Sequence, residues 1–392
     1  MTGFPIVFLK DIAHIEREIV QAANIEAGER YVGLENINSR GIVCGVVEAA
    51  AGQIASAKFR FTADHILYGK LRPYLSKIAL PDFSGVCSTD ILPLKPTELV
   101  DKRYLWHCLR QPSLVELANS RATGANLPRL SPKQLEDFEV PLPKLAEQKR
   151  IAAILDKADA LRAKRRKALE QLDALAQAVF IEMFSTATAQ GWKEVPIELL
   201  ASQEPGAIRT GPFGSQLLHS EFTDEGVAVL GIDNAVQNEF AWGESRYVSM
   251  EKYKQLSRYT VKPGDVIITI MGTCGRCAVV PQNIPLAINT KHLCCITLDQ
   301  AKCLPDFLHA YFLRHPLARG YLERTAKGAI MSGLNMGLIK SMPVKLPPLE
   351  LQAAFVRRIE GIRKQKAILR GHARQLDALF SSLQHRAFRG EL

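Results

Sequence analysis

The sequence lacks the features of a membrane or secreted protein. None of its apolar runs approaches the roughly 18 residues that a membrane-spanning helix needs. The first ten residues do not resemble a signal peptide, and the eight cysteines, with Cys294 and Cys295 adjacent, are typical of reduced thiols rather than of a disulfide framework. We therefore expect a protein of the cytoplasm that does not enter the membrane.

Three catalytic motifs are also missing. The chain has no Asn- or Asp-Pro-Pro-aromatic tetrapeptide, which holds the target amine in adenine methyltransferases, and no Gly-Lys-Ser/Thr at P-loop spacing. Asp82 follows Pro81, but no Glu-x-Lys stands near it to complete a metal-dependent nuclease site. The sequence therefore predicts no catalytic residue, and neither methyltransferase, ATPase nor nuclease activity in this chain alone.

A zinc site is weakly suggested and not favoured. Cys274 and Cys277 form one Cys-x-x-Cys, and Cys294, Cys295 and Cys303 follow, but a second paired Cys or His element is absent. The first half of the chain has no matching cluster. We expect buried thiols and no metal, with zinc as the alternative.

Composition and charge favour several folded domains. The 392 residues are 47% hydrophobic and 23% charged, which suits two or three domains. The net charge of +10 favours a polyanionic partner, yet eight of these ten charges fall in residues 144–184 and 350–392. Net charge alone therefore does not identify the remaining segments as DNA-binding.

The chain contains an internal repeat with an offset of 204 residues. QLDAL occurs at 171–175 and at 375–379, and the ungapped match of 104–184 with 308–388 has twenty identities. In 144–184 and 350–392 the apolar residues follow a 3,4 spacing behind prolines, which predicts two long helices that pair through an apolar seam. Short β-rich runs between turn residues fill the rest. The predicted fold class is α+β, with two domains of similar fold separated by two long antiparallel helices. A pseudo-two-fold axis would relate the two repeats, each a domain with its helix.

Several passages carry a family resemblance. In the first half they are YVGLENI (31–37), LYGKLRPYLSKIALP (67–81), STDILPL (88–94), TGANLPRLSP (123–132) and VPLPKLAEQKRIAAIL (140–155). In the second half they are RTGPFGSQL (209–217), GTCGRCAVV (272–280) and LPPLELQAAFVRRI (346–359). Over essentially its whole length the chain resembles the specificity subunit of type I restriction-modification enzymes.

The resemblance implies two target-recognition domains, at 1–143 and 192–349, which each read one half of a split double-stranded DNA site. The central conserved helix would be 144–184, the linker 185–191 and the C-terminal conserved helix 350–392. It implies two methyltransferase subunits as partners, with restriction subunits in the full complex. S-adenosylmethionine, ATP and Mg would be bound by those partners, and no cofactor by this chain.

The halves also differ, because the Gly-Pro-Phe-Gly-Ser loop is present only in the second, and Gly328-Ala329-Ile330-Met331 replaces Gly124-Ala125-Asn126-Leu127. We therefore expect them to read different bases. Basic, polar and glycine residues near turns are the DNA-contacting candidates: Lys70, Arg72, Tyr74, Arg121, Asn126, Arg129, Arg209, Gly211, Gly214, Ser215, Gln216, Arg276 and Lys291.

Apolar positions on the helices are the candidates for partner binding: Ile154, Leu161, Leu175, Ile359, Leu369 and Leu379. Two other interpretations stay open. The chain could serve a modification-only or type II-like methyltransferase system, or it could be a paired-domain scaffold that binds protein only.

Overall fold

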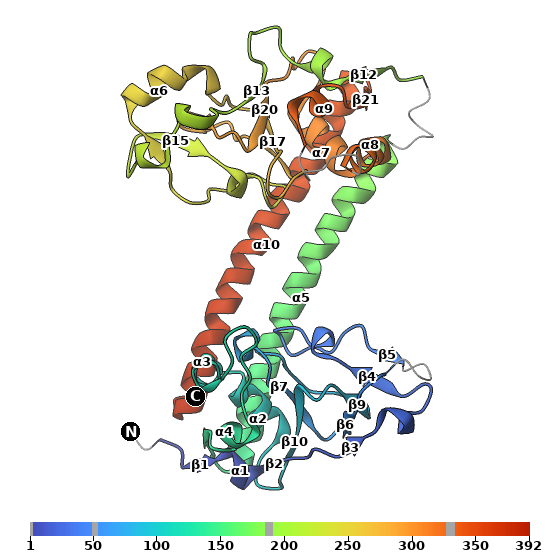
Figure 1. Cartoon of the computed structure of the whole chain (residues 1–392), viewed down its shortest axis with the longest axis vertical. Helices are drawn as coiled ribbons and strands as arrows, with labels where there is room; N and C mark the ends of the chain where they lie inside the picture. The colour runs from blue at the N-terminus through green and yellow to red at the C-terminus, as the bar shows by residue number, and fades with distance from the viewer. Residues whose placement is uncertain (1–2, 49–53, 185–190, 327–333) are drawn as a thin grey trace. The chain divides into compact units, whose positions relative to one another are not determined.

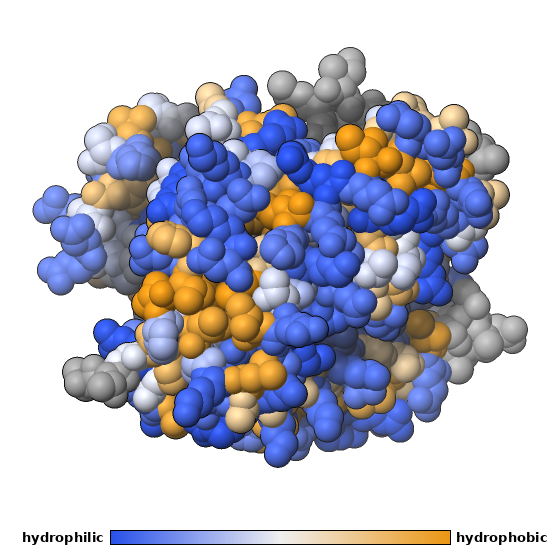
Figure 2. All heavy atoms as spheres, turned by 90° about the horizontal axis from the view of Figure 1, so that it is seen from below, coloured by the Kyte–Doolittle hydropathy of each residue, from blue (hydrophilic) through white to orange (hydrophobic). Residues whose placement is uncertain are grey.

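The computed structural model describes residues 3–48, 54–184, 191–326 and 334–392. The expected linker lies outside these residues except for Gly191, and so do residues 328–331 of the second half. The chain forms two compact units: unit one is Met1–Lys167 with Arg370–Leu392, and unit two is Ala168–Leu369. Within the described ranges no helix is long and apolar enough to span a membrane. On the face drawn in Figure 2, polar residues predominate and apolar ones form separate patches.

Unit one combines three small sheets with short helices (Figure 1). Its strands, in sheet order, are β1 (Ile6–Phe8) with β11 (Glu139–Pro141); β2 (Ala13–Ile15), β10 (Ile91–Pro96), β7 (Ile66–Gly69) and β8 (Ile78–Ala79); and β3 (Ile19–Val20), β6 (Lys58–Phe61), β9 (Gly85–Cys87), β4 (Arg30–Val32) and β5 (Val47–Glu48). All pairs are antiparallel except β4 with β9. The helices are α1 (Leu9–Ile12), α2 (Lys102–Leu109), α3 (Pro112–Arg121) and α4 (Pro132–Glu136), with 3-10 turns η1 (Ala22–Asn24), η2 (Leu34–Asn36) and η3 (Pro73–Leu75).

Unit two has a closely related plan. Its strands are β12 (Glu194–Pro196) with β21 (Pro343–Lys345); β13 (Ile208–Thr210), β20 (Leu293–Ile296), β17 (Val266–Thr269) and β18 (Cys277–Val279); and β14 (Phe222–Thr223), β16 (Tyr247–Val248), β15 (Val227–Leu230) and β19 (Ala287–Asn289). Here β15 and β19 are the parallel pair. The helices are α6 (Met250–Leu256), α7 (Pro305–Arg314), α8 (Pro316–Ala326) and α9 (Met336–Lys340), with 3-10 turns η4 (Ile197–Leu200), η5 (Gly214–Gln216), η6 (His219–Glu221), η7 (Ile232–Asn234) and η8 (Ser257–Tyr259).

The two units share more than the sequence repeat revealed. Each has a two-stranded pair just before its long helix, a four-stranded antiparallel sheet, and a sheet with one parallel pair. After the parallel strand, an asparagine closes the same turn: the Gly33 N–H donates to Asn36 Oδ1 (2.8 Å) and the Gly231 N–H to Asn234 Oδ1 (2.8 Å). The duplication therefore reaches well ahead of residue 104, which confirms two domains of similar fold.

The long helices are α5 (Leu145–Phe184) and α10 (Leu349–Arg389), and each contributes to both units (Figure 1). The start of α5 and the end of α10 complete the core of unit one, where Ile151 and Leu155 join Phe380 and Phe388. The end of α5 and the start of α10 complete the core of unit two. There the Phe184 ring contacts Phe307 and Phe355, with ring centroids 5.0 and 5.2 Å apart.

The aspartate of each QLDAL segment pairs with a cation on the other long helix. In unit one Asp377 of α10 accepts a hydrogen bond from Arg162 Nε of α5 (2.6 Å). In unit two Asp173 of α5 accepts one from Lys366 Nζ of α10 (2.7 Å). Since Arg162 and Lys366 are themselves 204 residues apart, both pairs follow from the same repeat.

A buried glutamine joins each long helix to its domain. Gln148 Oε1 accepts from the Asp101 N–H (2.7 Å), and its Nε2 donates to the carbonyls of Leu99 (3.1 Å) and Pro143 (2.8 Å). Gln352 repeats this arrangement with the N–H of Leu304 and two carbonyls. Asp101 and Leu304 are the N-caps of α2 and α7, so the glutamines accept from backbone N–H groups at helix starts.

We expect Gln148→Ala to destabilise unit one. The substitution leaves the part-buried backbone groups of Asp101 and Leu99 and the buried carbonyl of Pro143 without partners, which costs about 1 to 3 kcal/mol. Urea denaturation should show this loss, while Gln171→Ala, at an exposed position of α5, leaves the midpoint unchanged. Equal midpoints for both variants would contradict a joining role for Gln148.

Candidate nucleic-acid interface

Unit one brings three loops together beside the end of β7. The loop that follows β7 contains Lys70, Arg72 and Tyr74, and it pairs with the loop that precedes α4. The Arg72 N–H donates to the Pro128 carbonyl (2.7 Å), and the Leu130 N–H donates to the Lys70 carbonyl (2.9 Å). The turn before β10 completes the set, because the Lys70 N–H donates to the Asp90 carbonyl (2.9 Å). We call these segments, 70–76, 88–90 and 123–130, the loop cluster of unit one.

The side chains of this cluster are basic, polar and largely exposed. Arg72 has a left-handed backbone (φ 52°) where η3 begins, and both its side chain and that of Tyr74 are exposed. Asn126 is exposed in the 123–130 loop, where Gly124 also has a positive φ of 112°. Arg121 lies at the end of α3 and packs its guanidinium over the Phe138 ring (5.5 Å). The structure thus groups Lys70, Arg72, Tyr74, Asn126 and Arg129, with Arg121 half-buried at the end of the helix before them.

One acidic residue of the cluster was not among the sequence candidates. Asp90 accepts two hydrogen bonds from Arg129, from Nε (3.0 Å) and Nη2 (3.3 Å), and lies 4.0 Å from Lys70 Nζ. These hydrogen bonds raise the pKa of the Arg129 guanidinium above its usual value. Asp90 is the acidic residue of STDILPL, so the motif contained the signal although its role did not follow from the sequence.

Unit two presents its own loops beside β13, β17 and β19. Gly211 passes so close to β19 that a Cβ there would lie 2.0 Å from the Asn289 carbonyl oxygen, so only glycine fits. Lys291, half-buried, follows that strand, and Arg276 is exposed in the turn after β17. The Gly211 N–H donates to the Thr290 carbonyl (3.3 Å), which places Gly211 beside the segment that holds Lys291.

The Gly-Pro-Phe-Gly-Ser loop continues outward from Gly211. Gly214 has a positive φ of 58°, and Ser215 and Gln216 are exposed in η5. Gln216 Oε1 accepts hydrogen bonds from the Tyr259 hydroxyl (2.9 Å) and the Phe213 N–H (3.2 Å). The loop is therefore fixed to η8 while its polar tip faces solvent.

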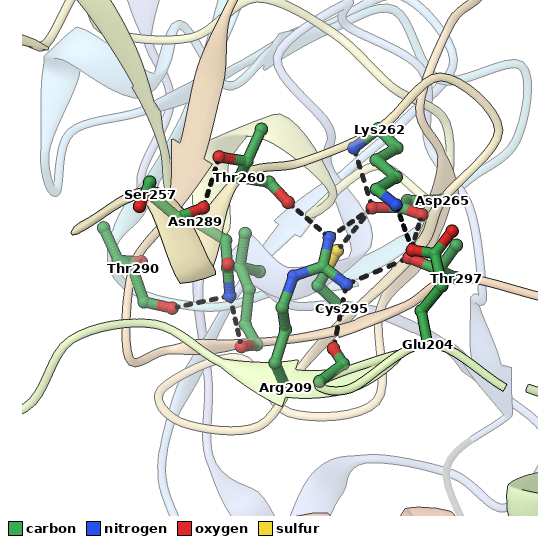
Figure 3. Close-up of polar contacts among 12 residues, drawn as sticks. Glu204, Arg209, Ser257, Thr260, Lys262, Asp265, Asn289, Thr290, Cys295 and Thr297 are labelled. Carbon is green, nitrogen blue, oxygen red and sulfur yellow. Dashed lines mark hydrogen bonds and ion pairs between the residues drawn. The ribbon is translucent and has the colours of Figure 1, made fainter. Parts of the chain in front are cut away.

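Arg209, in contrast, is a structural residue of unit two. Its side chain is only 9% exposed, and Figure 3 shows the guanidinium pointing toward Asp265 and Thr297. Nη2 donates to Asp265 Oδ2 (2.6 Å) and the Thr260 carbonyl (2.5 Å), and Nη1 donates to Thr297 Oγ1 (2.9 Å). An arginine held in this way is not available to DNA, which corrects the expectation for Arg209.

Two further residues beside these loops, His292 and Arg246, were not among the DNA-contacting candidates. His292 follows Lys291, and burial together with the positive charges of Lys291 and Arg246 lowers its pKa. Arg246 forms an ion pair with Asp233. Asp233 belongs to the segment GIDN (231–234), which is the counterpart of GLEN (33–36) in the first half. This similarity between the halves was the sequence signal that pointed to Asp233.

An apolar hollow lies between α5 and α10 within unit one. It has a volume of about 580 Å³ and is lined by Leu161, Lys164, Arg165, His372, Gln375, Leu376 and Leu379. Leu161 and Leu379 are about half exposed, although both are large and apolar. The hollow therefore combines apolar walls with basic edges.

The other partner-binding candidates divide into exposed and buried positions. Leu175 is 47% exposed in unit two, and Ile154 and Leu369 are partly buried. Ile359 is buried in the core of unit two, so it supports the fold and is not free to bind a partner. The expectation that Ile359 binds a partner is therefore wrong. It arose because residues that face a domain core and residues that face a partner follow the same apolar spacing along a helix.

Cys277, Cys294, Cys295 and Cys303 are buried in unit two, and Cys274 is half-buried. Burial raises the pKa of the Cys294 and Cys303 thiols to about 12, so these groups are neutral. Among the residues that the structure describes, no cluster of three His, Cys, Asp or Glu side chains could hold a metal ion.

We expect Arg209→Ala to unfold unit two more easily. Removing the guanidinium leaves Asp265 charged and buried, at a cost of about 3 to 5 kcal/mol. Arg276→Ala, at an exposed position, should stay within about 0.5 kcal/mol of the parent chain. Urea denaturation measures both, and an unchanged midpoint for Arg209→Ala would return this residue to the DNA-contacting set.

Comparison with known proteins places these features in a family. The model of the type I restriction modification DNA specificity domain matches residues 1–171 and 218–377. The type I restriction enzyme EcoBI specificity subunit of Escherichia coli is 26% identical over 74% of this chain, and the match covers 66% of that relative, just under two thirds of its length.

Two solved structures show the same fold. The type I restriction-modification system S subunit from M. genitalium has a TM-score of 0.57 at 14% identity, with 98% of this chain and 96% of that chain covered. A chain solved in work on complex assembly and conformational transition of the type I R-M system has a TM-score of 0.59 at 19% identity, with coverages of 100% and 99%. Because the family model matches more than half of the chain, the chain belongs to the family of type I restriction modification DNA specificity proteins.

Proposed function

We propose that this chain is the DNA-reading subunit of a type I restriction-modification complex. Each domain reads one half of a bipartite double-stranded DNA target, and the long helices carry the partners that modify it. The observation that supports this most directly is the duplication of a whole reading unit. In both copies, strands of the same two sheets end in exposed basic and polar loops.

The chemistry of those loops suits DNA. Arg72, Arg129 and Lys70 in unit one, and Arg276 and Lys291 in unit two, can contact phosphates or the major-groove edges of bases. The loops differ between the units, because Asp90 in unit one corresponds to His292 in unit two. The backbone shows this correspondence: the Lys70 N–H donates to the Asp90 carbonyl (2.9 Å), and the Ile270 N–H donates to the His292 carbonyl (2.9 Å). Two half-sites with different bases require different side chains, and the two units carry different side chains on the same backbone framework.

The proposal assigns the chemistry to other chains. Two methyltransferase subunits with S-adenosylmethionine modify the DNA, and restriction subunits with ATP and Mg complete the full complex. This chain is not catalytic and binds no cofactor. The apolar hollow of unit one supports the partner assignment, because half-exposed leucines beside basic side chains suit the apolar face of a helix with an acidic rim.

Two alternatives give different results. A modification-only or type II-like system uses the same reader without separate restriction subunits, so it predicts methylation without ATP-dependent cleavage. A protein-binding scaffold predicts no sequence preference on DNA. Exposed basic loops occur at the same place in both units. A DNA reader explains this arrangement, whereas a scaffold that binds only protein does not.

The proposal is tested by expressing the full chain with a methyltransferase partner and sequencing the methylated genome. We expect a methylated motif of two short specific parts separated by unspecified bases, and no methylation by this chain alone. A contiguous motif, or methylation without the partner, would overturn the proposal. A neighbouring reading frame that encodes the Asn- or Asp-Pro-Pro-aromatic tetrapeptide would supply the partner.

We expect Leu161→Lys combined with Leu379→Lys to prevent partner binding. Both side chains line the hollow and are already about half exposed, so the new charges leave the fold intact while they disrupt an apolar contact. Co-purification with the methyltransferase measures binding, and circular dichroism measures the fold. Ile181→Lys, equally exposed on α5 but outside the hollow, is the matched control. A complex retained by the double variant would remove the hollow as the docking site.

A further inference from the structure

Asp90 is held in place by the backbone of unit one. Its carbonyl accepts from the Lys70 N–H (2.9 Å), and its own N–H donates to Ser88 Oγ (3.3 Å). Arg129 is fixed as well, because its backbone exchanges two hydrogen bonds with Thr123 (2.8 and 3.0 Å). The carboxylate and the guanidinium therefore meet at a position that two loops define independently.

The pair uses one particular edge of the guanidinium. Asp90 accepts from Nε and Nη2, which together form the side edge of the arginine fork. The end edge, Nη1 with the second hydrogen of Nη2, remains open, and Nη1 makes no hydrogen bond to any residue within the described ranges. The Arg129 side chain is 45% exposed, so this edge can reach a ligand.

Stability does not explain the arrangement. An ion pair between a 45% and a 25% exposed side chain contributes little to folding, since solvent screens it and two side chains must be ordered. Its effect is to restrict Arg129 to one orientation before any ligand arrives. Restricting a side chain in advance reduces the ordering cost of binding.

An oriented end edge of arginine matches one base. Guanine presents two acceptors, O6 and N7, on its major-groove edge, and arginine binds both through two parallel hydrogen bonds. A phosphate would be bound equally well by an arginine that rotates freely, so phosphate contact gives no reason for the carboxylate. The second unit has His292 at the corresponding position, and it lacks this carboxylate.

We propose that Asp90 is a positioning residue which orients Arg129 to read a guanine in the half-site of the first domain. The inference rests on the proposed function, and it adds the base and the residue pair that selects it. Asp90 itself touches no DNA and acts through Arg129. We also expect the two half-sites to be selected by different chemistry, because unit two has His292 and not an aspartate at the position of Asp90.

The test measures base preference with the full chain in complex with its methyltransferase. The probe is a library of duplex DNA with randomised positions, and bound molecules are sequenced for the parent and for Arg129→Lys, Asp90→Asn and Asp90→Glu. Arg129→Lys keeps the charge but loses the fork, so it should reduce the preference for guanine at one position by about 5- to 150-fold. Asp90→Asn should reduce the same preference by about 2- to 13-fold, the ordering cost of one side chain. Asp90→Glu should restore part of it.

Three controls separate a positioning role from a structural one. Asp137→Asn removes another exposed carboxylate of unit one, which pairs with Lys10, and should leave every base preference unchanged. The second half-site should be unaffected in all variants. The combined exchange Asp90→Arg with Arg129→Asp keeps an ion pair and the fold, as thermal melting would confirm, but should lose the guanine.

The outcomes distinguish the inference from the function on which it rests. A parent complex that enriches no sequence overturns both. A bipartite motif whose first half is unchanged in Arg129→Lys and Asp90→Asn overturns only the inference. Uniform weakening on all sequences, with a salt dependence reduced by one phosphate contact, would instead make Arg129 a phosphate ligand and overturn guanine reading.

Discussion

Neither unit can complete its hydrophobic core from one continuous stretch of chain, and the rest of the structure depends on this constraint. Unit one needs Phe380 and Phe388 of α10 as well as the start of α5, and unit two needs Phe180 and Phe184 of α5 as well as the start of α10. Burial of these rings keeps the opposite end of each long helix at a domain. The helices are therefore part of both domains rather than a separate connector.

Polar contacts then give this apolar pairing its register. Each QLDAL aspartate forms an ion pair with a cationic side chain of the other long helix. In unit two this side chain, Lys366, also binds Glu239 of the loop after η7 (2.7 Å). In unit one the corresponding cation, Arg162, instead bonds Asp159 of its own helix (2.9 Å) and stacks over Phe380. One inherited pattern thus supports two different local networks, and the reading loops differ in the same way.

The sequence predicted the architecture better than the individual contacts. The repeat of 204 residues and the 3,4 apolar spacing predicted two similar domains and two long helices, because both patterns can be recognised without knowing which residues meet in space. The burial of Arg209 could not be predicted, since its partner Asp265 is 56 residues away and an arginine at the edge of a predicted turn looks the same in the sequence whether it is buried or exposed. Ile359 was assigned to partner binding because apolar spacing does not say which side of a helix is covered. Asp90 was overlooked because its importance depends on Arg129, which another loop supplies.

The buried glutamines bear on how such a chain can change over generations. Gln148 and Gln352 bind only backbone N–H and carbonyl groups, which every domain sequence provides. These hydrogen bonds therefore do not depend on the side chains of the domain, whereas the apolar contacts of the same helix starts do. Recombination that begins a new domain in the same short backbone segment would install a different reader on an unchanged frame. Under the proposed function, a new target choice would then arise in one genetic step, without any change in the surfaces proposed to bind the partners.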